Sequence, residues 1–345
     1  MVSDLMDFRE YVESNRKAIN SKILEYLPSG EPKEYSGMVR DYTERQGKYV
    51  RPSLLMLCGE MFGVDRVDMV LPAAIMQLSE DWILMHDDVE DDSELRRGRP
   101  ALHRIYGTEL AINAGDAAHL AMWEMVGDYL KRVGMEKGMK FYYWLAKVLD
   151  STVVGQYLDI KFTKDIRQVG KAGEEMYFDI VEKKTGCYSV YGPMQLGAIV
   201  AGKDAKTLDA LKAIGSPAGT SFQIIDDVLD ITSSEKTFGK QRYGDLYEGK
   251  LTLIVLHAYS KATRAERLKM DRIFKKDHKE KTKADIDFLV YLIGKYGSAD
   301  HAYAVAMKYG KQAQDAIKKH KAIFPDNDYY DIFISAVNAL FLRKR

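Results

Sequence analysis

The prolines of this sequence are unevenly distributed, which limits the secondary structure that the chain can form. The eight prolines leave two long stretches, residues 101–192 and 218–324, without any proline. Because proline removes a backbone donor and clashes with the preceding helical turn, such stretches favour helices. Apolar residues recur in them at helical spacing, as at Leu145, Val148 and Leu149, whereas strand-like alternation is scarce. The sequence therefore predicts an all-α protein.

The predicted helices are separated by short polar segments rather than by a linker of low complexity. These segments lie at residues 27–37, 62–69, 96–100, 201–207 and 233–245. No internal repeat divides the chain into halves. Because helices joined by short loops pack side by side, we expect residues 1–345 to form a single domain, a bundle of roughly ten or more helices.

Charge and cysteine content exclude several kinds of partner. The 51 Lys and Arg balance the 51 Asp and Glu, so no overall field attracts nucleic acid or an anionic membrane, and charge-based chemistry must be local. Cys58 and Cys187 are isolated in sequence, which suits a reducing cytoplasm. There is no signal-peptide pattern, and no apolar run approaches the roughly 18 residues of a membrane span. We expect a cytoplasmic protein with no nucleic-acid partner and no transmembrane segment.

Two aspartate clusters carry the strongest chemical signal. The segment HDDVEDD places Asp87, Asp88 and Asp91 in a DDxxD pattern, and IIDDVLDI repeats it. On a helix, residues i and i+4 share a face about 6 Å apart, where two carboxylates repel each other unless a cation lies between them. The second cluster consists of Asp226, Asp227 and Asp230.

A solvated acidic helix face is the alternative explanation for either cluster taken alone. It fits the second cluster poorly, because Ile224, Ile225, Val228 and Leu229 surround those aspartates and are hard to expose. Hard carboxylate oxygens suit magnesium, which is commonly shared with substrate phosphates. The paired clusters therefore predict a magnesium-dependent site for a phosphate or diphosphate ester.

Basic residues at several points complete this pattern. Taken singly, each is ordinary surface charge. Taken together, they can neutralise a diphosphate that remains anionic after about three magnesium ions have balanced the six carboxylates. These residues are Lys48 and Arg51, Arg96 and Arg97, Lys183 and Lys184, and Lys240 and Lys250.

The ordered motifs GKYVRP, HDDVEDDSELRRG, GQYLD, KKTG, FQIIDDVLDI and FGK…GDLYEGKLT resemble the trans-isoprenyl diphosphate synthase (polyprenyl synthetase) family over about residues 40 to 260. The short-chain geranylgeranyl and farnesyl diphosphate synthases are most similar. The resemblance implies an all-α bundle around a deep central cavity, usually as a homodimer. It also implies condensation of isopentenyl diphosphate with an allylic diphosphate, in which magnesium assists ionisation of the allylic substrate.

The resemblance further assigns roles to individual residues. Asp87, Asp88 and Asp91 are expected to hold two magnesium ions, and Asp226 with Asp230 a third, with manganese as a substitute. Asp227 completes the second catalytic cluster. Arg96, Lys184 and Lys240 are expected to bind the allylic diphosphate, with Lys250 closing the site. Lys48, Arg51 and Arg97 are expected to bind isopentenyl diphosphate, with Phe222 near its alkene, while Thr185 and Gln223 present oxygens to the developing cation.

One position departs from the family pattern. Six residues before the histidine of HDD the family usually has His or Gln as a further isopentenyl diphosphate contact, and this chain has Glu80. A carboxylate there repels a diphosphate unless it is protonated or paired with a neighbouring Lys or Arg.

Product length is expected to depend on the helix that precedes the first cluster. Trp82 lies five residues before Asp87, where short-chain members commonly have an aromatic residue, but a second aromatic does not follow, since the next residue is Ile83. Ser79, one turn below, obstructs less than a tryptophan. We therefore expect geranylgeranyl diphosphate in preference to farnesyl diphosphate.

Two alternatives share part of this pattern. Another class I terpenoid enzyme, a cyclase or a head-to-head synthase, explains the carboxylates but not a second diphosphate site built on GKYVRP and Arg97. A catalytically silent helical partner subunit is disfavoured, because both aspartate clusters are intact.

Overall fold

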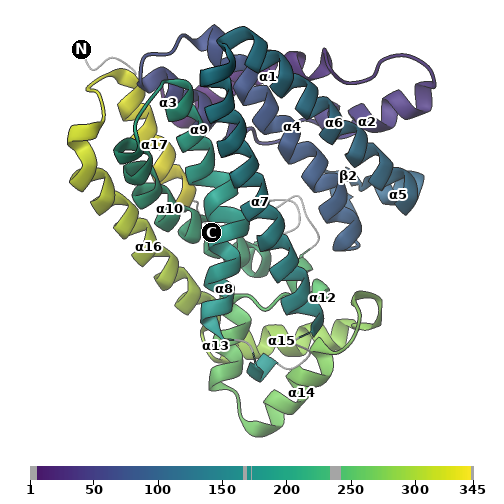
Figure 1. The fold of residues 1–345 in the computed structure, drawn as a ribbon. Coiled ribbons are helices and arrows are strands. Elements are labelled where there is room, and N and C mark those ends of the chain that lie inside the picture. The colour runs from purple at the N-terminus through teal and green to yellow at the C-terminus, as the bar shows by residue number, and fades with distance from the viewer. Residues whose placement is uncertain (1–5, 166–168, 172, 234–241, 343–345) are drawn as a thin grey trace.

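The computed structural model describes residues 6–165, 169–171, 173–233 and 242–342, and they are almost entirely helical, which confirms the predicted all-α class (Figure 1). The first half contains α1 Phe8–Leu24, α2 Lys33–Arg45, α3 Val50–Met61, α4 Arg66–Glu90, α5 Leu102–Tyr106, α6 Thr108–Val133 and α7 Met135–Asp165. The second half contains α8 Glu174–Ile180, the π-helix η2 Val181–Tyr191, α9 Gly192–Val200, α10 Ala205–Thr232, α12 Gly244–Glu248, α13 Leu253–Lys261, α14 Arg264–Phe274, α15 Lys283–Lys295, α16 Ser298–His320 and α17 Asp328–Phe341. Short 3-10 turns lie at η1 Val169–Lys171, η3 His278–Glu280 and η4 Lys321–Ile323.

A small hairpin is the only β-structure among the described residues. Strands β1 Leu95–Arg96 and β2 Arg99–Pro100 pair antiparallel. Arg97 and Gly98 form the turn, and both have positive φ, at 53° and 76°. A two-residue turn with this backbone twist holds hairpin strands in register. The hairpin follows the first aspartate cluster directly and fixes where Arg96 and Arg97 point.

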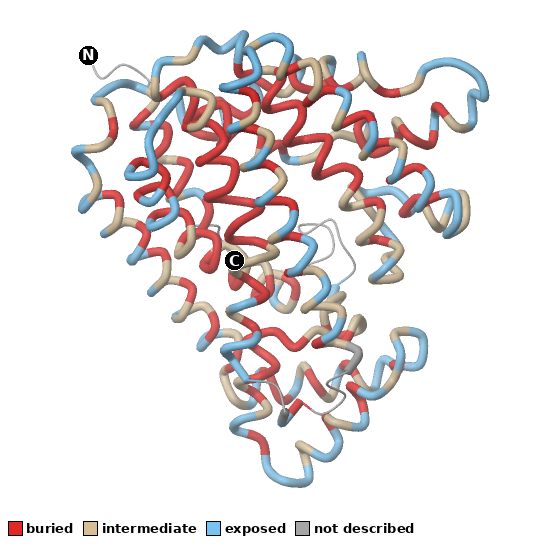
Figure 2. The backbone as a smooth tube through the Cα atoms, in the orientation of Figure 1, coloured by how far each residue is buried: buried red, intermediate tan, exposed pale blue. Residues whose placement is uncertain are grey.

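The buried apolar side chains form two clusters that lie along the same long helices. The larger cluster includes Leu211 of α10 and Ala313 of α16, and the smaller includes Ile225 of α10 and Ala306 of α16. Figure 2 shows this buried interior running along the inner faces of the helices. Because α10 and α16 pass through both clusters, the aspartates of α10 lie in the region where the two clusters meet.

Candidate active site

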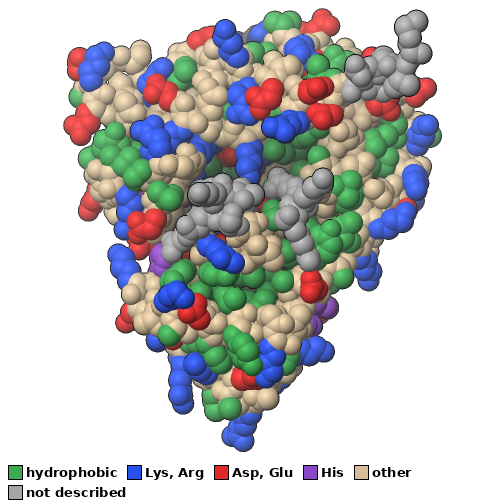
Figure 3. All heavy atoms as spheres, turned by 180° about the vertical axis from the view of Figure 1, so that it is seen from behind, with side chains coloured by type: hydrophobic (Ala, Val, Ile, Leu, Met, Phe, Trp, Pro, Cys, Tyr) green, Lys and Arg blue, Asp and Glu red, His purple; other side chains and the backbone are tan. Residues whose placement is uncertain are grey.

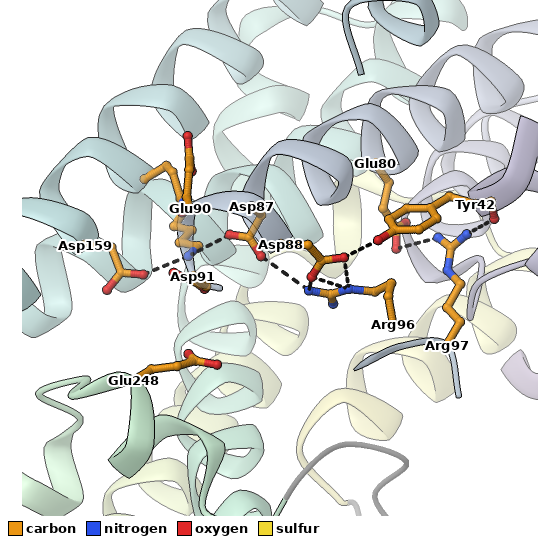
Figure 4. A network of polar contacts seen from close by, with 12 residues as sticks. Tyr42, Glu80, Asp87, Asp88, Glu90, Asp91, Arg96, Arg97, Asp159 and Glu248 are labelled. Atoms are coloured by element: carbon orange, nitrogen blue, oxygen red, sulfur yellow. Dashed lines mark hydrogen bonds and ion pairs between the residues drawn. The ribbon is translucent and has the colours of Figure 1, made fainter. Parts of the chain in front are cut away.

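The first aspartate cluster lies at the C-terminal end of α4 (Figure 4). Asp88 is fully buried and accepts hydrogen bonds from Arg96 Nε at 2.9 and 3.0 Å, from Arg96 Nη2, and from the hydroxyl of Tyr42. Arg96 Nη2 also lies 3.5 Å from Asp87 Oδ2. The hairpin arginine therefore joins the two adjacent carboxylates of the motif.

Two lysines bring distant motifs onto the same carboxylates. Lys184 Nζ of η2 lies 3.5 Å from Asp87 Oδ1 and 2.7 Å from Asp159 Oδ2 of α7. Lys250 Nζ lies 3.0 Å from Asp91 Oδ2 and 2.6 Å from Glu248 Oε2. The motifs HDDVEDD, GQYLD, KKTG and EGK thus converge at one place, with Asp87 and Asp91 facing the lysines.

Burial and charge compete at this cluster. Burial raises the pKa of Asp91 above its ordinary value, while Lys250 opposes that shift. Burial alone lowers the pKa of Lys250, but Asp91 and Glu248 outweigh it and raise that pKa well above its usual range. The lysine therefore stays charged and neutralises carboxylates that are costly to bury alone.

The second aspartate cluster is held by contacts of a different kind. Asp227 is buried and accepts hydrogen bonds from the hydroxyl of Tyr177 at 2.7 Å and from Gln223 Nε2 at 2.8 Å. Burial, with the nearby Asp245 carboxylate, raises the pKa of Asp227 well above its ordinary value. Asp227 is therefore held inside the protein by neutral hydrogen-bond donors.

Asp226 and Asp230 have surroundings that differ from those of Asp227. Asp226 is half-buried, and Asp230 accepts backbone hydrogen bonds from Gly244 at 3.1 Å and Asp245 at 3.3 Å. These contacts tie the end of α10 to the start of α12. The segment between them, which contains Lys240, lies outside the described residues.

The π-helix η2 places Lys184 and Thr185 between α7 and α10. Thr185 Oγ1 donates to Gln223 Oε1 at 2.7 Å. Two glycines allow this close approach: a Cβ on Gly155 would lie 2.6 Å from the backbone nitrogen of Lys184, and one on Gly219 would lie 2.6 Å from Cα of Gly186. Glycine is therefore required at both contacts.

Two residues assigned to isopentenyl diphosphate, Arg51 and Arg97, lie beside Glu80, where the chain departs from the family pattern. Glu80 Oε1 lies 3.1 Å from Arg51 Nη1 and 3.8 Å from Arg97 Nη2. Arg97 Nη2 also lies 2.8 Å from Asp81 Oδ1. Glu80 is therefore paired with arginines, one of the two conditions under which a carboxylate is tolerated there.

The residues assigned to product length lie on two sides of α4. Trp82 is buried, and its ring lies 4.5 Å from that of His119 on α6. Ser79 is buried on the side that faces η2, 3.0 Å from the hydroxyl of Tyr188. Tyr188 in turn lies under Arg51, at 4.7 Å. Ile83 is half-buried, one turn after Ser79 on α4.

Two further predicted site residues, Lys48 and Phe222, are placed by a pocket and by apolar packing. Lys48 lines a pocket of about 380 Å³ together with residues of α1 and α17, including Arg9, Arg16 and Leu340. Phe222 is half-buried and packs against the larger apolar cluster. A second pocket, of about 520 Å³, lies between α10 and α16, away from both aspartate clusters.

Several residues of this region were missed by motif analysis. Tyr42, Tyr177, Glu248 and Asp81 each contact a predicted site residue. Asp81 alone carried a usable signal, because it lies seven residues before Asp88 and so on the same face of α4. The two tyrosines could not be recognised, because their partners lie 46 and 50 residues away in sequence.

The aspartate carboxylates are of the chemical type that binds magnesium, but they do not form a complete set of ligands for one ion by themselves. Within the described ranges, no three His, Cys, Asp or Glu side chains are grouped closely enough to bind one ion together. Magnesium sites that bind phosphate substrates commonly use one or two carboxylates and complete the octahedron with phosphate oxygens and water. Asp87 and Asp91, one turn apart and already neutralised by lysine ammonium groups, fit that arrangement.

None of the described helices combines the length and apolar composition needed to cross a bilayer. The fold and the site define the class of this protein: an all-helical protein with two aspartate clusters and converging basic residues, suited to diphosphates. The Polyprenyl synthetase family pattern matches residues 32–290. The chain belongs to that family.

Individual relatives agree with this assignment. The chain is 33% identical to a geranylgeranyl diphosphate synthase of Methanosarcina mazei, covering 91% of this chain and 93% of the relative. It is 31% identical to a geranylfarnesyl diphosphate synthase of Natronomonas pharaonis, over 92% and 95%.

Solved structures agree as well. A geranylgeranyl pyrophosphate synthetase from Pyrococcus horikoshii superposes with a TM-score of 0.83 at 30% identity, covering 98% of each chain. A geranylgeranyl pyrophosphate synthase from Corynebacterium glutamicum, complexed with isoprenyl diphosphate and magnesium, has the same fold, with a TM-score of 0.86 at 20% identity over 98% of this chain and 100% of that chain.

Proposed function

We propose that this protein is a short-chain trans-prenyltransferase that condenses isopentenyl diphosphate with an allylic diphosphate within a single domain. The convergence of Lys184 and Lys250 on the carboxylates of Asp87, Asp91 and Asp159 carries the proposal. The convergence of charged residues from four separate motifs on one place disfavours a catalytically silent subunit. A cyclase has no use for the second group of arginines around Glu80.

The allylic diphosphate is bound by Arg96, Lys184 and Lys250, together with Lys240. When bound, about three magnesium ions held by Asp87, Asp88, Asp91, Asp226 and Asp230 would supply Lewis-acid stabilisation of the leaving diphosphate, and manganese can take their place. The lysines then exchange carboxylate partners for phosphate oxygens, so that the ammonium groups follow the negative charge as the carbon–oxygen bond breaks.

The allylic cation forms beside Thr185 and Gln223. Because Thr185 donates its hydroxyl proton to Gln223, its oxygen lone pairs are available to the cation. The alkene of isopentenyl diphosphate, held by Arg51, Arg97 and Lys48 with Phe222 nearby, attacks the cation. A proton then leaves to the released diphosphate, and apolar walls keep water out.

We favour geranylgeranyl diphosphate as the product over farnesyl diphosphate. Trp82 supports this proposal as a bulky side chain on the helix beside the growing tail, with the smaller Ile83 following it. The relatives above include synthases of twenty- and twenty-five-carbon products.

The active form is proposed to be a cytoplasmic homodimer. Helices α6 and α7 carry several large apolar side chains that are more than half exposed, and a second copy of the chain can cover them. They are Leu120, Tyr143, Val153 and Tyr157. Cys58 and Cys187 are free thiols, as expected in a reducing compartment.

Incorporation of radiolabelled isopentenyl diphosphate tests this function. With geranyl or farnesyl diphosphate as primer, we expect labelled product in magnesium or manganese and none in excess chelator. Asp226→Ala should lower turnover at least about a hundredfold without loss of helicity. Asp209→Ala, an exposed aspartate on the same helix, is the matched control. Full activity in chelator, or equal activity of both variants, would exclude the mechanism.

A further inference from the structure

The lower end of the molecule differs in charge from the rest of the chain. Residues 261–295, here called the basic tip, carry eleven Lys and Arg against six Asp and Glu, whereas the whole chain is neutral. The tip comprises α14, η3 and α15 and projects below the body in Figure 1. Figure 3 shows basic side chains gathered around the same end.

The acidic groups of the tip are mostly used in internal contacts. Asp271 accepts hydrogen bonds from the hydroxyl of Tyr259 and from the backbone of Val169, both at 3.2 Å. The exposed Asp277 and Glu280 cap the short turn η3. The other three form ion pairs: Glu266 with Lys295 at 2.6 Å, Asp285 with Lys276 at 2.6 Å and Asp287 with Lys283 at 2.7 Å.

Five cations remain exposed, with no carboxylate partner among the described residues: Lys261, Arg264, Lys269, Arg272 and Lys275. On α14, the spacing of Arg264, Arg272 and Lys275 puts them on one helix face. Leu268 lies between them on that face and is 51% exposed.

The opposite face of α14 packs into the protein core. Met270, Ile273 and Phe274 are buried in the smaller apolar cluster. A helix anchored in this way presents its cationic face, with one apolar side chain in the middle, as a fixed surface.

A second apolar group lies on the neighbouring helix α15. Tyr291 is 61% exposed, three residues after Phe288, so the two share a helix face. Lys269 Nζ of α14 lies 3.8 Å from the centroid of the Phe288 ring. The tip thus combines unpaired cations with exposed Leu and Tyr side chains.

We propose that the basic tip docks the protein on the surface of a bilayer that contains anionic lipids. Lysine and arginine near such a surface are attracted to the headgroups, and Leu and Tyr side chains enter the boundary between headgroups and acyl chains. A nucleic-acid surface would use the same cations but gains nothing from the exposed Leu268, so the apolar residues favour the bilayer.

The tip is also joined to the rim of the active site. Lys279 pairs with Asp92 at 3.4 Å, one residue beyond the first aspartate cluster, and Lys281 donates to the carbonyl of Tyr247 at 2.6 Å. If the proposed function holds, docking releases a twenty-carbon product beside the phase in which its tail dissolves. The docking surface itself does not depend on that function.

Vesicle flotation of the purified full-length chain tests the proposal. We expect binding to vesicles of phosphatidylcholine containing about one third phosphatidylglycerol, and weak binding to phosphatidylcholine alone. The variant Lys261→Gln/Arg264→Gln/Arg272→Gln/Lys275→Gln should bind at least about tenfold more weakly. Leu268→Gln should also weaken binding, with the larger relative effect at physiological salt, where screening reduces the ionic part.

A control of equal charge change uses exposed lysines elsewhere: Lys206→Gln/Lys308→Gln/Lys318→Gln/Lys319→Gln. Equal binding of both quadruple variants, equal binding to both vesicle types, or no binding by the parent chain would overturn the proposal. So would tighter binding to a single-stranded RNA oligonucleotide that is insensitive to Leu268→Gln. Flotation is carried out without substrate, and prenyl transfer is assayed without vesicles, so failure of one proposal is distinguishable from failure of the other.

Discussion

Glu80 lies between two arginines that the proposed mechanism needs for a diphosphate. Its Oε1 pairs with Arg51 at 3.1 Å, while Oε2 is buried without a hydrogen-bond partner among the described residues. One carboxylate charge thus offsets part of the positive charge of Arg51 and Arg97. An incoming diphosphate must compete with a resident anion.

Replacing that anion should strengthen binding of the second substrate. In Glu80→Gln, which keeps the shape of the side chain, we expect the KM for isopentenyl diphosphate to fall severalfold while the KM for the allylic primer stays unchanged. Glu80→His should act in the same direction. Steady-state kinetics with each substrate varied in turn measure the split. A raised KM for isopentenyl diphosphate would mean that Glu80 instead holds the arginines in place.

How much of the site could be predicted from the sequence depends on the residue. The aspartates lie in short motifs whose local spacing is enough to single them out, whereas Lys184 is ordinary surface charge when taken singly and is assigned by the resemblance to the family. Which residues pair with Glu80 could not be predicted from local spacing, because Arg51 lies on α3 and Arg97 lies in the hairpin turn, where its φ is positive. Tyr42 and Tyr177 carry no local pattern, and only the fold brings them to Asp88 and Asp227.

At the scale of single elements, we propose that the packing of α4 against α6 limits the space for a product tail. Trp82 packs against His119, and Trp123 Nε1 donates to His119 Nε2 at 2.8 Å. In Trp82→Ala we expect products longer than twenty carbons, since the removed ring opens space beside α4. Chromatography of the dephosphorylated products measures the change.

The same substitution costs stability, because truncating a buried tryptophan typically costs about 3–5 kcal/mol. The thermal stability of Trp82→Ala should therefore be measured together with its products. Trp144→Ala on α7, a half-buried tryptophan distant from α4 in sequence, controls for loss of volume alone. If the distribution of product lengths were unchanged in Trp82→Ala, the side chain that limits product length would lie on another helix.

The contact between α14 and α15 predicts a pH-dependent stability. Hydrogen bonds from Lys295, Tyr296 and Thr263 lower the pKa of Glu266 from its ordinary 4.5 to about 2. The folded protein therefore holds this carboxylate charged more firmly than the unfolded chain does. Its stabilising effect is fully present above about pH 4.5 and is lost as the pH falls towards 2.

In Glu266→Gln, we expect the melting temperature to vary less between pH 4.5 and 2 than in the parent chain. Calorimetry at several pH values measures the slope. Glu136→Gln, an exposed glutamate on α7, should leave the slope unchanged. Parallel curves for Glu266→Gln and the parent would show that the contact does not form in solution.

Helices could be predicted from the sequence, but their irregularities could not. Pro72 lies inside α4 and Pro217 inside α10, so these helices continue through prolines. The π-helical stretch of eleven residues carries Lys184 and Thr185, and no local pattern marks it. It arises where η2 passes between α7 and α10, with Gly155 and Gly219 allowing close approach.

For the whole molecule, assembly is the property most open to test. If α6 and α7 form the dimer surface, Leu120→Glu should yield a monomer, because a buried unpaired charge opposes association. Light scattering after gel filtration should give twice the chain mass of 39.3 kDa for the parent and a single chain mass for the variant. Val67→Glu, equally exposed at 66% but on α4, should remain dimeric. A monomeric parent chain would contradict the proposal.

Lys184 and Lys250 provide counter-ions within the site itself. In proteins whose metal ion holds the chain together, a chelator unfolds the molecule. Here ammonium groups already balance the carboxylates of Asp87 and Asp91, so folding and catalysis have separate ionic requirements. We therefore expect a freshly synthesised chain to reach and keep its native shape where free magnesium is scarce, and to begin turnover once the ion and its substrate bind together.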